Sequence, residues 1–153
     1  MMPVTRPQKL FFALLLAEAI LVAVLGYFFP SRLDSGFSWV VMPPLHARFV
    51  ASLYFFGVVV MIGGLLARDR RDIQPILPAA VVWTGLLFIV SIYHLDNFDF
   101  EKIPVLIWMI AYFVDPLIGL WLIWQGRKTW RLSPSTLPGW IRAYLLLQGS
   151  IFS

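Results

Sequence analysis

The chain has 153 residues, of which 60% are hydrophobic, 13% are charged and none is cysteine. Soluble domains carry about 25% charged residues, so this chain has too little charge to cover a surface that faces water on all sides. The lack of cysteine excludes disulfides, thiolate metal sites and iron–sulfur clusters. The charges that give the net charge of +4 lie in short clusters between apolar runs. This distribution is the one that orients a membrane protein, and it argues against nucleic-acid binding.

Four apolar runs are each about twenty residues long, the length that a helix needs to cross a bilayer. They predict transmembrane helices at 9–29, 46–67, 76–95 and 104–125. The first run is too long for the core of a signal peptide, about 7–15 residues, so we expect it to be retained. The predicted fold class is an all-α membrane protein, a bundle of four antiparallel transmembrane helices with a partial fifth helix at the C-terminus.

The basic residues predict the orientation of this bundle. If the four helices alternate in direction, nine basic residues lie on one side of the membrane: Arg6, Lys9, Arg68, Arg70, Arg71, Arg127, Lys128, Arg131 and Arg142. Three lie on the other side: Arg32, Arg48 and Lys102. Because the cytoplasmic side carries the excess of Lys and Arg, we expect a multi-pass protein of the cell (inner or plasma) membrane with a cytoplasmic N-terminus and C-terminal segment.

Residues 1–130 form the predicted four-helix transmembrane domain, and residues 131–153 follow it as a cytoplasmic linker and a short apolar stretch. Eleven residues at 143–153 are too few to cross the membrane. Their pattern resembles the start of the first helix at an offset of 130 residues, and internal repeats are frequent in membrane proteins. Two interpretations remain open: a helix in the membrane interface, or the start of a truncated second repeat near Leu137.

Two acidic residues are predicted near the middle of the membrane, where ionisable groups are costly and therefore informative. Glu18 lies nine residues beyond Lys9, about 13 Å along a helix, and Asp115 lies eleven beyond Pro104, about 16 Å. Pro116 follows Asp115 and frees the carbonyl of Tyr112, four residues before the proline. These groups form a candidate proton or cation site, as in the broken helices of transporters; the alternative is that both acids are protonated packing groups.

Arg48 is the third charged residue that we consider for this site, since it lies early in the second predicted helix. It is shallow enough to reach the outer interface with its long side chain, or it could turn inward toward a carboxylate. Each of the first two predicted helices contains a pair of alanines four residues apart, Ala19 and Ala23 in the first and Ala47 and Ala51 in the second. Such small residues allow close approach of helices in membranes.

The two histidines, His46 and His94, begin and end predicted helices at the outer surface. Imidazoles from two helices of a bundle can ligate haem b, so they are weak candidates for a cofactor site; His94 with the acidic residues at 96–101 could instead hold a divalent cation. The preferred expectation is that the protein has neither a cofactor nor a metal. The sequence has no phosphate-binding glycine loop and no serine–histidine–acid arrangement, so no motif of this kind indicates an enzyme.

The segment Pro43-Pro44-Leu45-His46-Ala47-Arg48, continued to Gly57, resembles a helix entrance of uncharacterised bacterial multi-pass membrane proteins. The likeness covers residues 43–67, and it implies that Arg48 belongs to a shared motif without implying an activity. Some of those proteins carry tandem copies, which suits a second repeat. The sequence thus favours a non-enzymatic integral membrane protein whose partners are the lipid bilayer and other membrane subunits or a second repeat. The alternatives are a small transporter or proton-coupled binding protein using Glu18 and Asp115, and a haem b electron carrier.

Overall fold

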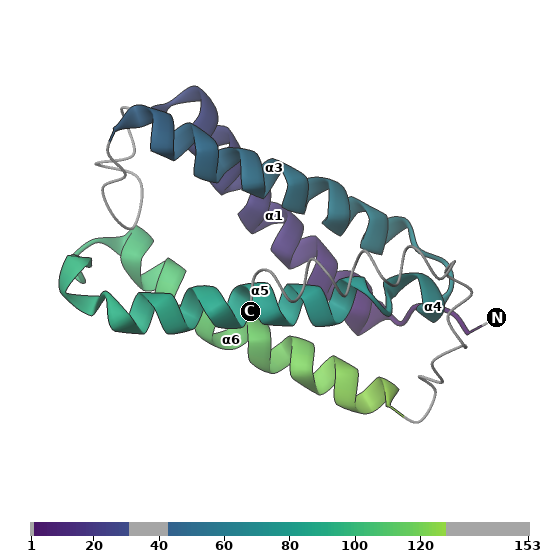
Figure 1. The fold of residues 1–153 in the computed structure, drawn as a ribbon. Coiled ribbons are helices and arrows are strands. Elements are labelled where there is room, and N and C mark those ends of the chain that lie inside the picture. The colour runs from purple at the N-terminus through teal and green to yellow at the C-terminus, as the bar shows by residue number, and fades with distance from the viewer. Residues whose placement is uncertain (1, 31–42, 128–153) are drawn as a thin grey trace, which may run out of the picture.

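The computed structural model describes residues 2–30 and 43–127, and within them the chain is helical. The four long helices are α1 (Arg6–Phe28), α3 (Pro44–Leu66), α5 (Ile76–Tyr93) and α6 (Ile103–Gly126), with the short α4 (Arg70–Ile73) and the 3-10 turn η2 (Leu95–Asn97) between them (Figure 1). Apart from a single bridge between Pro3 and Asp69, the described residues contain no β-structure. The predicted all-helical class and its four long apolar helices are therefore confirmed.

The helix bounds differ from the predicted ones by up to three residues, for local reasons. α1 begins at Arg6 rather than at residue 9 because Thr5 and Gln8 form a capping box: the Thr5 N–H donates to Gln8 Oε1 at 2.9 Å, and the Gln8 N–H donates to Thr5 Oγ1 at 3.5 Å. α5 ends at Tyr93 because the chain tightens into η2. The predicted linker and partial helix at 131–153 lie outside the described residues.

α4 was not predicted, and it ties the turn after α3 to the N-terminal segment. Asp69 caps it by accepting a hydrogen bond from the Arg71 N–H at 3.0 Å, and this bond lowers the pKa of the Asp69 carboxyl. The Arg70 N–H donates to the Met2 carbonyl at 2.9 Å, and Arg70 Nε donates to the Pro3 carbonyl at 3.2 Å. The start of α1 and the end of α3 are thus joined at one end of the molecule (Figure 1).

The long helices pack as two pairs, α1 with α3 and α5 with α6 (Figure 1). Glycines make the close contacts. A Cβ at Gly26 of α1 would lie 2.9 Å from the Ala51 Cβ of α3, and a Cβ at Gly64 of α3 would lie 2.9 Å from the Phe12 ring of α1. Small residues allow such approach in membranes, and the alanine pairs expected there, at 19 and 23 and at 47 and 51, are buried.

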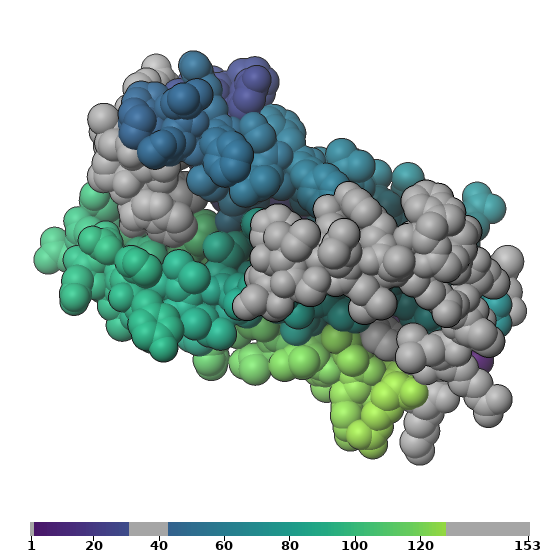
Figure 2. Space-filling view, viewed as in Figure 1, coloured from purple at the N-terminus to yellow at the C-terminus, as the bar shows by residue number. Residues whose placement is uncertain are grey.

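The outer surface of the helices is apolar. Phe56 and Leu66 of α3 are 71% and 74% exposed, and many large apolar side chains of the other helices are also exposed. Figure 2 shows α3, in blue, and part of α5, in teal to green, at the surface of the molecule. α1, α3, α6 and the stretch Arg70–Tyr93 are each long and apolar enough to cross a membrane. A surface of this kind suits lipid as its solvent, because in water it would far exceed the apolar patches of ordinary monomers.

Candidate functional site

Glu18 and Asp115 come together from different helices. Each is the thirteenth residue of its helix, in α1 of 23 residues and in α6 of 24 residues, so both lie half-way along. The two side chains lie close enough for their carboxyl groups to interact electrostatically. Asp115 is only 1% exposed, whereas Glu18 is partly exposed. The structure thus brings together two residues that the sequence analysis singled out separately by their depth.

Two neighbouring carboxyl groups can share a hydrogen bond only when one of them carries a proton, because ionised carboxylates provide only acceptors. The Glu18–Asp115 pair is therefore suited to holding a proton. Asp115 Oδ2 is fully buried and has no hydrogen-bond partner among the described residues. A buried polar atom without a partner is costly, so this oxygen is a natural position for a second proton or for a ligand group.

Two tyrosines extend this polar cluster. Tyr54 of α3 and Tyr112 of α6 are both buried, and their hydroxyl oxygens share a hydrogen bond of 2.7 Å. The Trp108 ring packs on Tyr112 with centroids 4.2 Å apart, and its Nε1 donates to Ser91 Oγ at 3.0 Å. These two hydrogen bonds link α6 to α3 and to α5. Together with the Trp108 ring, they hold Tyr112 in place beside the carboxyl pair.

A cavity of about 370 Å³ lies beside the cluster, between α1, α3 and α5. Glu18, Tyr54, Thr84 and Tyr112 supply its polar lining, and apolar or aromatic side chains supply the rest. Part of that lining is exposed on α3 and α5, including Phe56 and Trp83 at 71% and 46%. The cavity therefore reaches the apolar outer surface, and Glu18 belongs to its lining whereas Asp115 does not.

The other residues that the sequence predicted for this site have different roles or positions in the structure. We singled out the carbonyl of Tyr112 from the sequence, but its hydroxyl makes the cross-helix hydrogen bond and its side chain lines the cavity. α6 stays helical through Pro116. Arg48 is exposed near the start of α3 and does not line the cavity. Its carbonyl accepts a hydrogen bond from Ser52 Oγ at 2.8 Å.

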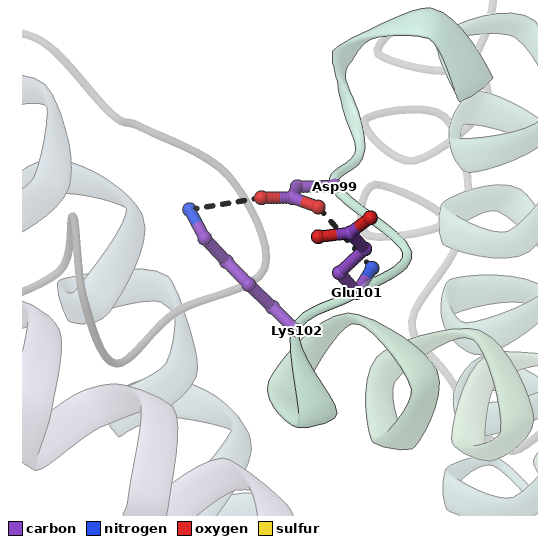
Figure 3. Close-up of polar contacts among 3 residues, drawn as sticks. All are labelled: Asp99, Glu101 and Lys102. Atoms are coloured by element: carbon purple, nitrogen blue, oxygen red, sulfur yellow. Dashed lines mark hydrogen bonds and ion pairs between the residues drawn. The ribbon is translucent and has the colours of Figure 1, made fainter.

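The histidines and the acidic loop stand apart from this cluster. His46 and His94 are both exposed, and Nδ1 of His94, which follows α5, is hydrogen-bonded to the Val90 carbonyl of α5 at 2.8 Å. In the loop before α6, Asp99 accepts the Glu101 N–H at 3.2 Å and pairs with Lys102 Nζ at 3.6 Å (Figure 3). Among the described residues, no three acidic or histidine side chains gather as a metal site would require.

Sequence reasoning missed Tyr54, Thr84 and Trp83, which line the cavity. Polar and aromatic side chains are scattered through all four apolar runs, and their spacing does not reveal which helix packs beside which. A tyrosine eight residues into the second predicted run was the available signal, because a hydroxyl at that depth requires a partner. The partner, Tyr112, lies 58 residues away in the chain.

Searches of family models, of curated proteins and of solved structures found no match to this chain. The resemblance of residues 43–67 to multi-pass membrane proteins therefore stays a prediction, and the site is interpreted from its own geometry.

Proposed function

We propose that this chain is a multi-pass protein of the cell membrane that binds and releases a proton at the Glu18–Asp115 pair, as a small transporter or proton-coupled binding protein. Its four spans run antiparallel, with the N-terminus and the C-terminal segment in the cytoplasm. The observation that carries the proposal is the meeting of two carboxyl groups, half-way along α1 and α6, beside a cavity. A packing role alone gives no reason for a cavity at that point.

Electrostatics support a proton site rather than a fixed ion pair. The described residues that line the cavity include no Lys or Arg, so no fixed positive charge there compensates the two acids. In a medium of low dielectric constant an unpaired charge is costly, and a carboxyl group becomes neutral by taking up a proton. Glu18 is the member of the pair that faces the cavity, and it therefore provides the path by which a proton reaches Asp115.

The basic residues support the orientation. The turn after α3 carries Arg68, Arg70 and Arg71, whereas the loop between α5 and α6 carries Asp96, Asp99 and Glu101 with a single lysine. By the positive-inside rule, this difference supports a cytoplasmic turn at 68–75 as part of the proposal. The apolar outer surface then faces the lipid, which is the partner that the proposal requires.

Infrared spectroscopy of the protein reconstituted in liposomes tests the proton site. We expect a carbonyl-stretching band of a protonated carboxyl group that shifts on deuterium exchange and changes between acidic and alkaline buffer. The band should be lost in the double variant Glu18→Gln, Asp115→Asn, which keeps the shapes of both side chains. As a control, Asp99→Asn in the exposed loop should leave the band unchanged.

A band that neither exchanges nor titrates would leave the two acids as packing groups. The protein would then be the non-enzymatic structural membrane protein that the composition alone suggests.

A further inference from the structure

The cavity beside Glu18 combines one acidic group with aromatic walls. Tyr54 and Trp83 meet edge to face, with ring centroids 6.4 Å apart, and Phe56 and Tyr112 also belong to the lining. Aromatic rings attract cations through their negative faces, and such aromatic cages recognise quaternary ammonium groups. A carboxyl group in the wall of an aromatic and aliphatic cavity therefore favours a molecule with one positive charge and an apolar body.

The charges around Glu18 also favour a cationic ligand. The titratable groups that face it are Asp115 and Tyr112 from α6 and Tyr54 from α3, while α5 contributes the neutral Thr84. Among the described lining residues there is no basic side chain that would repel a cation. An anion would meet two carboxyl groups without a compensating charge, so an anionic ligand is disfavoured.

The size and the opening of the cavity fit a small organic molecule. About 370 Å³ lies at the lower end of the range for ligand pockets, roughly 300–1,000 Å³. Phe56 and Trp83 at the rim are exposed on helices that we place in lipid. An apolar cation dissolved in the membrane would reach Glu18 from the side, between α3 and α5, without crossing a polar surface.

We propose that this cavity binds a lipophilic organic monocation of the alkylammonium or arylammonium class, with its charged group at Glu18 and its apolar body against Tyr54 and Trp83. The inference rests on the proposed proton site and extends it. When the cation binds, one proton leaves the carboxyl pair for water and one monocation takes its place, so the total charge in the site does not change. The protein would then exchange a proton for an organic cation.

The test uses benzyltrimethylammonium and its neutral isostere neopentylbenzene, which differ by a nitrogen cation in place of a carbon. Binding of the radiolabelled cation to the full-length protein is measured by equilibrium dialysis in neutral detergent. We expect saturable binding that the neutral isostere displaces at least about tenfold less effectively than the unlabelled cation, a difference of about 1.4 kcal/mol. In weakly buffered solution, up to one proton should be released for each cation bound.

Matched variants locate the binding site. Trp83 lines the cavity and Trp121 of α6 does not, yet both are 46% exposed. We expect Trp83→Leu to weaken cation binding several-fold and Trp121→Leu to leave it unchanged, while Glu18→Gln abolishes proton release and most of the binding. If Glu18→Gln does not fold, the isostere comparison and the two tryptophan variants still show whether the cavity binds the cation.

Three results would overturn the inference: equal competition by the neutral isostere, equal effects of the two tryptophan variants, or binding without proton release. Absence of cation binding by a protein whose carboxyl band titrates would also refute the cation inference, while the proton site would stand. If the carboxyl band does not titrate, the proposed function itself fails, and the cation inference fails with it.

Discussion

Replacing Gly119 with leucine is expected to destabilise the protein strongly, because this glycine lies where α6 meets α5 and α1. A Cβ at Gly119 would overlap Val81 Cγ2 of α5 and would lie 3.2 Å from Phe11 Cζ of α1. Val81 and Phe11 are both buried, so neither can move away without disturbing its own neighbours. Overpacking of this kind costs about 1–3 kcal/mol, and more where the backbone has to shift.

The measurement is the unfolding midpoint in mixed micelles of increasing SDS content, followed by circular dichroism. Gly63→Leu is the matched control: it adds the same side chain to an exposed glycine of α3, where a Cβ would meet nothing within 4 Å. The control should unfold within about 0.5 kcal/mol of wild type, as is usual for surface substitutions. Equal stability of both variants would show that α5 and α6 do not pack as described.

The second large effect is expected at Asp115, where alanine and asparagine should behave differently. Asp115→Ala removes the partner of Glu18 and leaves a partly buried carboxyl group without its hydrogen bond, which costs about 1–3 kcal/mol. It also empties a position that is 1% exposed. Asp115→Asn keeps the volume and supplies an amide that can donate to Glu18, so most of that stability should be retained.

The same unfolding assay separates the two causes when Glu18 is also changed. In a Glu18→Leu background, Asp115→Ala no longer removes a hydrogen bond between the acids, so its additional cost should fall to the packing contribution. Contacting residues show such non-additivity, whereas independent ones add. If the costs of Glu18→Leu and Asp115→Ala simply add, the two carboxyl groups do not interact.

Much of the fold was predictable because the bilayer imposes one length on every crossing helix. The four apolar runs were found to within three residues, and the errors lie where short-range hydrogen bonds decide, as at Thr5 and Gln8. The meeting of Glu18 and Asp115 was predictable from depth alone, since charged groups inside a membrane require partners.

The rest of the site depends on which faces the helices turn toward each other, and hydropathy does not encode this in an all-apolar helix. Tyr54 could not be paired with Tyr112, nor Trp83 assigned to a cavity wall, before the helix pairs were known. Arg48 was grouped with the acids by charge, but the helix pairing leaves it exposed near the start of α3, and it does not line the cavity.

The account rests on four membrane crossings that hold the carboxyl pair between the two faces of the bilayer. Because the chain contains no cysteine, single cysteines test this directly with a maleimide that does not cross membranes. In intact cells, Asn97→Cys in η2 should react at once, whereas Gln74→Cys, between α4 and α5, should react only after the cells are permeabilised. Reaction of both cysteines from the same side would contradict the account.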